Sequence, residues 1–141
     1  MSLHSYSKCW LHLIWATLNR ERFLNTIEIR KKVSYYLYQY AESKNIYMKK
    51  IYVNSEHVHA LIDLPTKLSI EEVMHLLKGS SSHWINENNI SNGKFSWGRG
   101  YAAFSVSESV LHKVIDYIEQ QEEHHRVKSF SEEYAEFINA Y

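Results

Sequence analysis

Two histidines stand two positions apart in the segment His57-Val58-His59, inside a run of residues that predicts a β-strand. Side chains two apart on a strand point to the same face, so both imidazoles can reach one ion while Val58 faces the core. Imidazole is the commonest metal-ligating side chain. The same spacing also fits two histidines on the exposed face of a sheet. The pair is therefore a candidate metal site that needs a second feature.

A tyrosine and a glutamine supply that second feature on a predicted helix. Tyr117 and Gln121 are i, i+4 neighbours, so their side chains lie one above the other. They cluster with His124 at the edge of an apolar stripe made of Val114, Ile115 and Ile118. At such an edge the core holds the ring in place, and a substrate can still reach the phenol oxygen. The alternative is a tyrosine that caps the core with its hydroxyl in water.

Together these side chains suit chemistry on a phosphodiester. Two imidazoles and one amide make an open N/O site, which fits Mg²⁺ or Mn²⁺ beside a phosphate better than a closed structural zinc. A phenol with a pKa near 10 is a poor nucleophile at neutral pH. A divalent cation would polarise the phosphate and stabilise the leaving oxygen. The tyrosine would then hold one strand end covalently and conserve the bond energy for rejoining.

The elements that must position these residues follow from the apolar periodicity. Thr26 is a plausible N-cap, and Ser69 with Glu72 forms a capping box. Ser107 is expected to cap the helix that carries Tyr117. The predicted strands are residues 6–17, 46–54 and 57–64, with a further extended stretch at 95–106. The predicted helices are residues 26–44, 69–88, 107–124 and 131–141.

This order, β-α-β-β-α-β-α-α, predicts an α+β fold. We expect a ferredoxin-like or RNA-recognition-motif-like antiparallel sheet with helices packed on one face, plus a C-terminal helix. The short link between 46–54 and 57–64 indicates a hairpin. The whole chain, 1–141, is expected to be one domain, because no linker, repeat or low-complexity stretch interrupts it. The fold alone does not give a function.

Composition narrows the classes of protein. No apolar run is long enough for a membrane span, and the N-terminus lacks the pattern of a signal peptide. The chain has a single cysteine, Cys9, which excludes an internal disulfide, so the expected compartment is the reducing cytoplasm. Cys9 stands in an apolar run and is expected in the core. The net charge is +0 with neutral histidines, which counts against gripping duplex DNA by bulk positive charge. The 11 Tyr and 4 Trp include faces on which unpaired bases could stack.

With these motifs the chain resembles a known family, the single-tyrosine transposases of the HUH endonuclease superfamily (the "IS two-hundred"-like group of small insertion sequences). His57-Val58-His59, within EHVHALIDLP, resembles the metal motif of the family. The helix VIDYIEQQ is similar to its YIxxQ helix, with Tyr117 as nucleophile and Gln121 as third metal ligand. The strand at residues 11–17, the turn through Arg20 and the stretch at residues 97–106 are also similar. The resemblance runs from about Tyr6 to His125.

The resemblance implies a DNA transposase that cuts and rejoins single strands at imperfect hairpins. It implies a 5′-phosphotyrosine, a free 3′-OH and a need for Mg²⁺ or Mn²⁺. Members form homodimers in which the tyrosine helix of one subunit completes the metal site of the other. Basic and polar side chains would contact the DNA backbone, and the candidates are Lys8, Arg20, Arg22, Lys78, Ser80 and Arg99. Each of these also fits a solvated surface position.

Other interpretations stay open from the sequence. A domesticated or inactive relative, or an RNA-recognition-like module, would bind single strands without metal and without a role for Tyr117. A histidine-motif nucleotide hydrolase would need HxHxH, and Leu61 occupies the third position. A purely structural dimer is the remaining alternative. The acidic segments after Gln121 and at residues 131–141 favour the inactive relative or a tail that covers the dimer edge.

Overall fold

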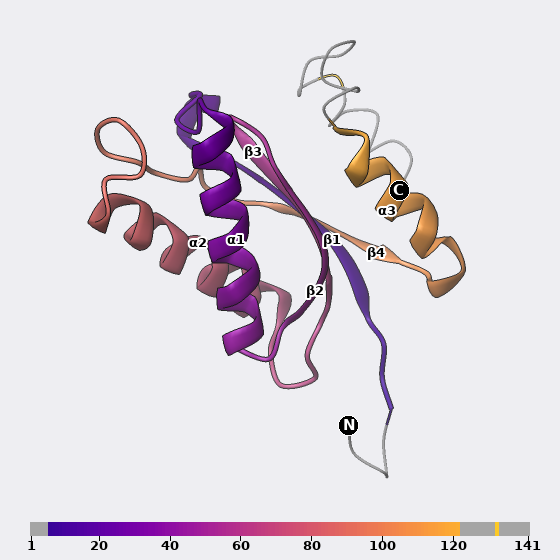
Figure 1. Cartoon of the computed structure of the whole chain (residues 1–141). Helices are drawn as coiled ribbons and strands as arrows, with labels where there is room; N and C mark the ends of the chain where they lie inside the picture. The colour runs from indigo at the N-terminus through magenta and orange to yellow at the C-terminus, as the bar shows by residue number, and fades with distance from the viewer. Residues whose placement is uncertain (1–5, 122–131, 133–141) are drawn as a thin grey trace.

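The computed structural model describes residues 6–121 and Glu132, and Figure 1 shows how its elements are arranged. The predicted fold class is confirmed: four strands form one antiparallel sheet, and helices pack against it. The strands are β1 (Trp10–Ala16), β2 (Tyr47–Val53), β3 (His57–Asp63) and β4 (Ala102–Val106). The helices are α1 (Ile27–Ser43), α2 (Ile70–Glu87) and α3 (Leu111–Glu119), with short 3-10 turns η1 (Leu18–Arg20) and η2 (Glu108–Val110).

The sheet has the strand order β2-β3-β1-β4, and each neighbouring pair is antiparallel. β1 and β3 therefore lie in the middle. β2 and β3 form the expected hairpin through residues 54–56. In β3 all residues from His57 to Ile62 are buried, because elements cover both faces of the sheet. The histidine motif thus lies on a central, buried strand rather than on an exposed face.

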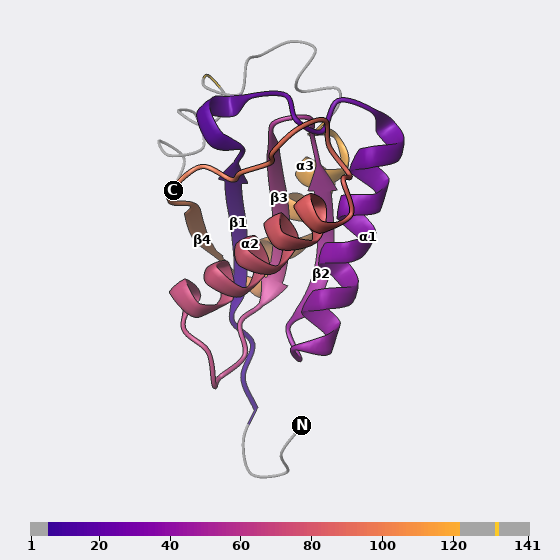
Figure 2. The same cartoon turned by 90° about the vertical axis from the view of Figure 1, so that its left-hand side faces the viewer.

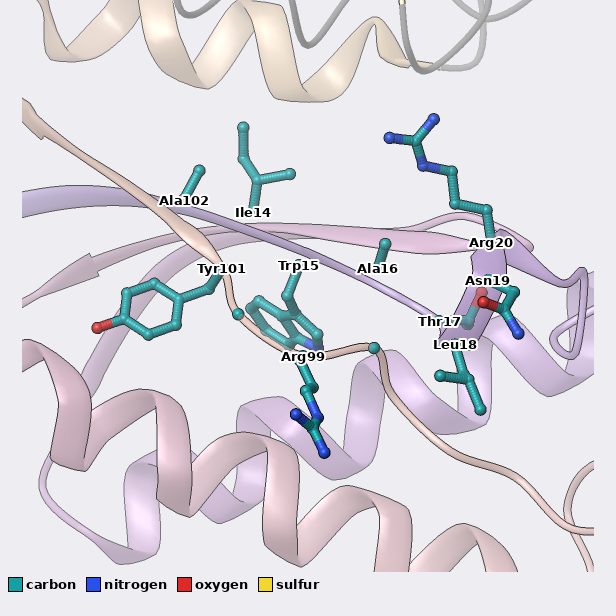
Figure 3. Close-up of a pocket in the computed structure, with 12 residues that line it drawn as sticks. Ile14, Trp15, Ala16, Thr17, Leu18, Asn19, Arg20, Arg99, Tyr101 and Ala102 are labelled. Atoms are coloured by element: carbon teal, nitrogen blue, oxygen red, sulfur yellow. The ribbon is translucent and has the colours of Figure 1, made fainter.

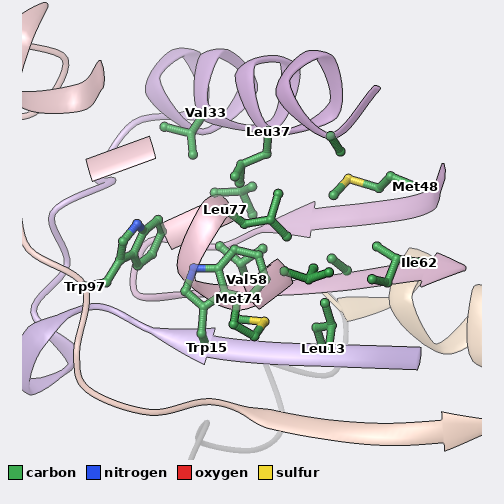
Figure 4. Packing of buried hydrophobic residues seen from close by; sticks show 14 of the residues in the cluster. Leu13, Trp15, Val33, Leu37, Met48, Val58, Ile62, Met74, Leu77 and Trp97 are labelled. Atoms are coloured by element: carbon green, nitrogen blue, oxygen red, sulfur yellow. The ribbon is translucent and has the colours of Figure 1, made fainter. Parts of the chain in front are cut away.

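One face of the sheet carries α1 and α2, which lie in front of the strands in Figure 2. Every second residue of β1 and β3 points to this side, where Leu13, Trp15 and Val58 are buried. Val33 and Leu37 of α1 pack on them, together with apolar residues of α2 (Figure 4). Both helices begin as predicted. Thr26 Oγ1 accepts from Ile29 N, and Ser69 with Glu72 forms the full capping box.

The other face carries α3, on the side of the sheet opposite α1 and α2 (Figure 1). Ile118 is buried there against Trp10, Leu61 and Val106. Two polar contacts fix this helix at its ends. The indole N–H of Trp10 donates to the carboxylate of Glu108 just before α3, and Lys50 of β2 pairs with Glu119 at 2.8 Å.

Several local expectations need adjustment. Cys9 is exposed, not in the core, because it precedes β1 at the end of the sheet. Ser107 makes no side-chain cap, since its hydroxyl contacts Ser109 instead and a 3-10 turn precedes α3. The part of the predicted tyrosine helix beyond residue 121, with His124, lies outside the described residues. So does most of the helix expected at 131–141, of which only Glu132 is described. No described helix combines the length and apolarity that crossing a membrane requires.

Candidate active site

The two histidines of the motif lie side by side beneath α3. His57 and His59 are 0% and 1% exposed, and their ring centroids are 5.1 Å apart. Strand alternation explains this placement, because Val58 between them points to the opposite, apolar face. Burying two imidazoles is unfavourable unless they have polar partners or ligands. Their burial in a central strand is therefore stronger evidence for polar partners or ligands than the spacing of the motif alone.

Tyr117 of α3 packs against His59 of this pair. Its ring centroid lies 6.1 Å from that of His59 and 6.2 Å from that of His12 on β1, with edge-on geometry in both cases. The tyrosine is half-buried. This exposure confirms the position predicted for Tyr117, at the edge of the apolar stripe of the helix.

Gln121 lies one turn further along and is 0% exposed. Its Nε2 donates to the backbone carbonyl of Tyr117 at 3.2 Å. Its Oε1 is buried and has no hydrogen-bond partner among the residues that the structure describes. A buried amide oxygen without a partner is costly, and a cation would compensate for that cost. This oxygen is therefore a candidate metal ligand.

The donor set fits a hard or borderline divalent ion. In the described part of the chain, no three His, Cys, Asp or Glu side chains form a candidate metal cage. A site here would take two imidazole nitrogens from His57 and His59 and its third protein donor from Gln121. Three protein donors leave positions open for a phosphate oxygen and water, as an Mg²⁺ or Mn²⁺ site requires.

A third histidine, His12, belongs to the same cluster and was not identified from the sequence. It is 0% exposed, and its Nε2 lies 2.9 Å from Nδ1 of His59. Burial lowers the pKa of His12 to about 3, so the ring is neutral at physiological pH. Alternation along β1 places His12 with Trp10 and Ile14. The predicted ferredoxin-like order places β1 beside β3, but the sequence does not reveal the register of that pair, which brings His12 diagonally beside His59.

The six candidate DNA contacts are not gathered in one place. Arg20 and Arg99 line the same pocket, of about 450 Å³, at the end of β1. Figure 3 shows that Arg20 points to the α3 side of the sheet and Arg99 to the side of α1 and α2. Asn19 and Arg20 both have φ of 55°, a left-handed conformation that costs non-glycine residues energy. This strained turn directs Arg20 toward the side of the sheet that carries the histidines.

The remaining candidates lie apart from that pocket. Arg22 is exposed just after η1. Lys8 lies at the opposite end of β1, where it pairs with Asp63 at 3.5 Å and sits 5.2 Å from the Trp10 ring. Ser80 is half-buried on α2, with its hydroxyl 3.4 Å from the carbonyl of Leu77. Of these three, Arg22 has the placement most open to a nucleic acid.

Lys78 has a structural task in this fold. Its Nζ donates to the carbonyls of Gly98 and Gly100, at 2.8 and 2.9 Å. Partial burial also lowers the pKa of Lys78. The loop that carries Arg99 is thereby tied to α2, and the ammonium has fewer donors left for a phosphate.

We therefore expect Lys78→Met to lower the free energy of unfolding by roughly 1–3 kcal/mol, the usual cost of lost hydrogen bonds from a charged donor. Urea unfolding measures this, with exposed Lys67→Met as the matched control. Unchanged stability, combined with DNA binding that is weaker and less salt-dependent, would instead assign Lys78 to a phosphate contact.

The neutral net charge is unevenly distributed along the chain. Residues 6–121 contain 14 Lys and Arg against 11 Asp and Glu, whereas residues 122–141 contain two against five. The part of the chain that forms the sheet and its helices is therefore basic. The low overall charge comes from the acidic residues 122–141 and does not argue against a polyanionic substrate for residues 6–121.

Comparisons with known proteins identify relatives of the whole described region. The family model "Transposase IS200 like" matches residues 5–121. The transposases of insertion sequence IS200 from Salmonella typhimurium and Salmonella typhi are each 30% identical over 125 residues, which is 84% of this chain and 80% of theirs.

Solved structures show the same fold. A putative transposase from Deinococcus radiodurans superposes with a TM-score of 0.66 at 23% identity, covering 86% of this chain and 96% of that one. A REP-associated tyrosine transposase bound to a REP hairpin gives a TM-score of 0.64 at 15% identity, covering 89% of this chain and 74% of that one. The family match spans the histidine motif and the tyrosine helix together, and the chain belongs to the IS200-like transposase family.

Proposed function

We propose that this transposase cuts and rejoins single-stranded DNA at hairpin ends, through a covalent 5′-phosphotyrosine on Tyr117 and with Mg²⁺ or Mn²⁺ bound. Two observations support this proposal. Tyr117 of α3 packs against His59, and the buried Oε1 of Gln121 has no hydrogen-bond partner among the residues that the structure describes. A nucleophile from α3, two histidines from β3 and Gln121, two residues after the end of α3, would thus form the site. The lone Cys9 favours action in the reducing cytoplasm.

In the cleavage step, the phenol oxygen of Tyr117 attacks the scissile phosphorus. A P–O bond to tyrosine forms, the bond from phosphorus to the 3′ oxygen breaks, and that oxygen takes a proton to become a free 3′-OH. Rejoining reverses these changes: a 3′-OH attacks the phosphotyrosine, and the phenol recovers its proton. Because the number of phosphodiester bonds is conserved, no external energy source is needed.

The chain's own residues prepare this step by position. The edge-on packing against His12 and His59 holds the phenol ring, which limits the entropy lost on reaching the reactive geometry. His57, His59 and Gln121 would hold the ion. When bound, the ion supplies Lewis-acid activation of the phosphate and favours the phenolate.

DNA recognition is proposed for the turn and loop beside this site. One structural relative is bound to a hairpin, and we infer that a hairpin is the substrate class here as well. Arg20, Arg22 and Arg99 are exposed, and Arg20 and Arg99 line one pocket at the end of β1 (Figure 3). Lys8, Ser80 and Lys78 are assigned weaker roles, because the structure engages them in the contacts described above. Phosphate contacts by the arginines would position the strand, and unpaired bases would be read by stacking.

We further propose that the active protein is a homodimer in which α3 of one subunit completes the site of the other. The contacts that hold α3 on its sheet, Trp10 with Glu108 and Lys50 with Glu119, lie in one chain here. The same contacts can form between two copies if the helix is exchanged, which is a low-cost route to dimers.

Complementation between two inactive variants tests the exchange. Tyr117→Phe and the double variant His57→Ala, His59→Ala are co-expressed with different tags, and mixed dimers are tested for cleavage. We expect activity to return at roughly a quarter of all sites, since half of randomly assorted dimers are mixed and each has one intact site. Mixed dimers that stay inactive would show that α3 serves its own sheet.

The proposed function itself is tested with hairpin DNA taken from the flanks of the gene. Purified protein with Mg²⁺ or Mn²⁺ is expected to convert the single strand to a protein-linked product and a free 3′ end, and chelation is expected to prevent this. If the hairpin is bound but never cut under any metal condition, the protein acts as a binding module and the proposal is wrong.

A further inference from the structure

His12 makes a direct polar contact with one histidine of the pair, His59. It comes from β1, one strand away from the motif, and it is fully buried on the α3 face. Its Nε2 is 2.9 Å from Nδ1 of His59, and the two rings are tilted by 36°. A hydrogen bond of this length fixes the rotation of both rings and places one proton between the two nitrogens.

The position of that proton decides what His59 can bind. A neutral imidazole carries its single proton on one nitrogen and a lone pair on the other. If His12 donated, Nδ1 of His59 would be the acceptor and its Nε2 would carry hydrogen, which prevents ligation there. If His59 donates from Nδ1, its Nε2 has the lone pair that a metal requires.

We propose that His12 is a positioning residue that accepts the Nδ1–H of His59 and thereby keeps the Nε2 of His59 ready as a metal ligand. This inference rests on the proposed function only in taking His59 as a ligand. His12 would then carry its own proton on Nδ1. Metal-ligating histidines generally donate their second nitrogen to such a partner, and losing the partner typically costs about 10–100-fold in metal affinity.

A purely packing role predicts different behaviour from the same residue. A buried imidazole that only fills space can be replaced by a ring of similar shape, with no change in metal binding. A positioning acceptor can be replaced only by a side chain that offers a lone pair near the same point. His12→Phe keeps a ring without the acceptor, and His12→Gln offers an amide oxygen near the place of Nε2.

We expect His12→Phe to weaken Mn²⁺ binding by about 10–100-fold. His12→Gln should stay within about threefold of the wild type, because its amide oxygen can accept the same hydrogen. Affinity is measured by electron paramagnetic resonance of free Mn²⁺, without DNA, and exposed His75→Phe on α2 serves as control. Equal Mn²⁺ affinity in wild type and in both His12 variants would overturn the inference.

Nitrogen-15 NMR of the metal-free wild type tests the inference without any variant that could misfold. At a pH where the imidazoles are neutral, His59 should show the Nδ1–H tautomer and His12 should also be protonated at Nδ1. A His59 protonated at Nε2 would overturn the inference. Both measurements are independent of catalysis: a wild type that binds Mn²⁺ but forms no DNA adduct contradicts the proposed function and leaves the role of His12 intact.

Discussion

Tyr117→Phe is expected to fold and bind hairpin DNA like the wild type, yet to form no covalent adduct. Removing one oxygen deletes the nucleophile and leaves the ring that packs on His12 and His59. Loss of a nucleophile removes most of the rate enhancement, so strand cleavage should fall by at least roughly a thousandfold. Single-turnover cleavage of a labelled hairpin, resolved on a denaturing gel, measures the effect.

The matched control is Tyr35→Phe on α1, an exposed tyrosine on the opposite side of the sheet. It should cleave at the wild-type rate. Adducts that persist in Tyr117→Phe would mean that another of the 11 tyrosines, or another nucleophile, carries the DNA. The family assignment would remain, and the assignment of the nucleophile would be wrong.

The double variant His57→Ala, His59→Ala is expected to lose metal binding. Two of three protein donors disappear, so the affinity for Mn²⁺ should fall by more than about a hundredfold, beyond the cost of losing one outer partner. Cleavage should fall with it, while hairpin binding in chelator should be unchanged. Titration calorimetry with Mn²⁺ provides the affinity.

Control substitutions for the histidines are available on α2. His75 and His83 are exposed, and their replacement by alanine should leave both the Mn²⁺ affinity and cleavage unaltered. Metal binding that survives in the double variant would place the ion elsewhere. In that case the buried oxygen of Gln121 would need a different explanation.

The parts of the fold that follow local rules could be predicted from the sequence. Strand alternation around Val58 separates the two histidines from the core. The periodicity of α2 and its capping box at Ser69 define that helix to within a residue or two. The i, i+4 spacing of Tyr117 and Gln121 predicts that they lie close together, and Gln121 Nε2 donates to the carbonyl of Tyr117. These features depend on neighbours in the sequence, which a single chain displays directly.

The features that depend on distant pairing could not be predicted in the same way. His12 joins the site because of the register between β1 and β3, and nothing within residues 6–17 indicates that register. The apolar run around Cys9 suggested burial, but β1 begins one residue later. The sequence presents Lys78 as a candidate DNA contact or a solvated surface residue, and in the structure its Nζ donates to two carbonyls about twenty residues further along. In each case the three-dimensional arrangement, not the local pattern, decides the role.

The assignment of Tyr117 as the covalent nucleophile is tested most directly by mapping the adduct. Wild-type protein is reacted with hairpin DNA and Mn²⁺, digested with nuclease and trypsin, and analysed by mass spectrometry. We expect a residual 5′-phosphonucleotide on the peptide of residues 114–126, whose single tyrosine is Tyr117, and none when chelator is present. A nucleotide on any other peptide, or cleavage with no protein-linked nucleotide at all, would contradict it.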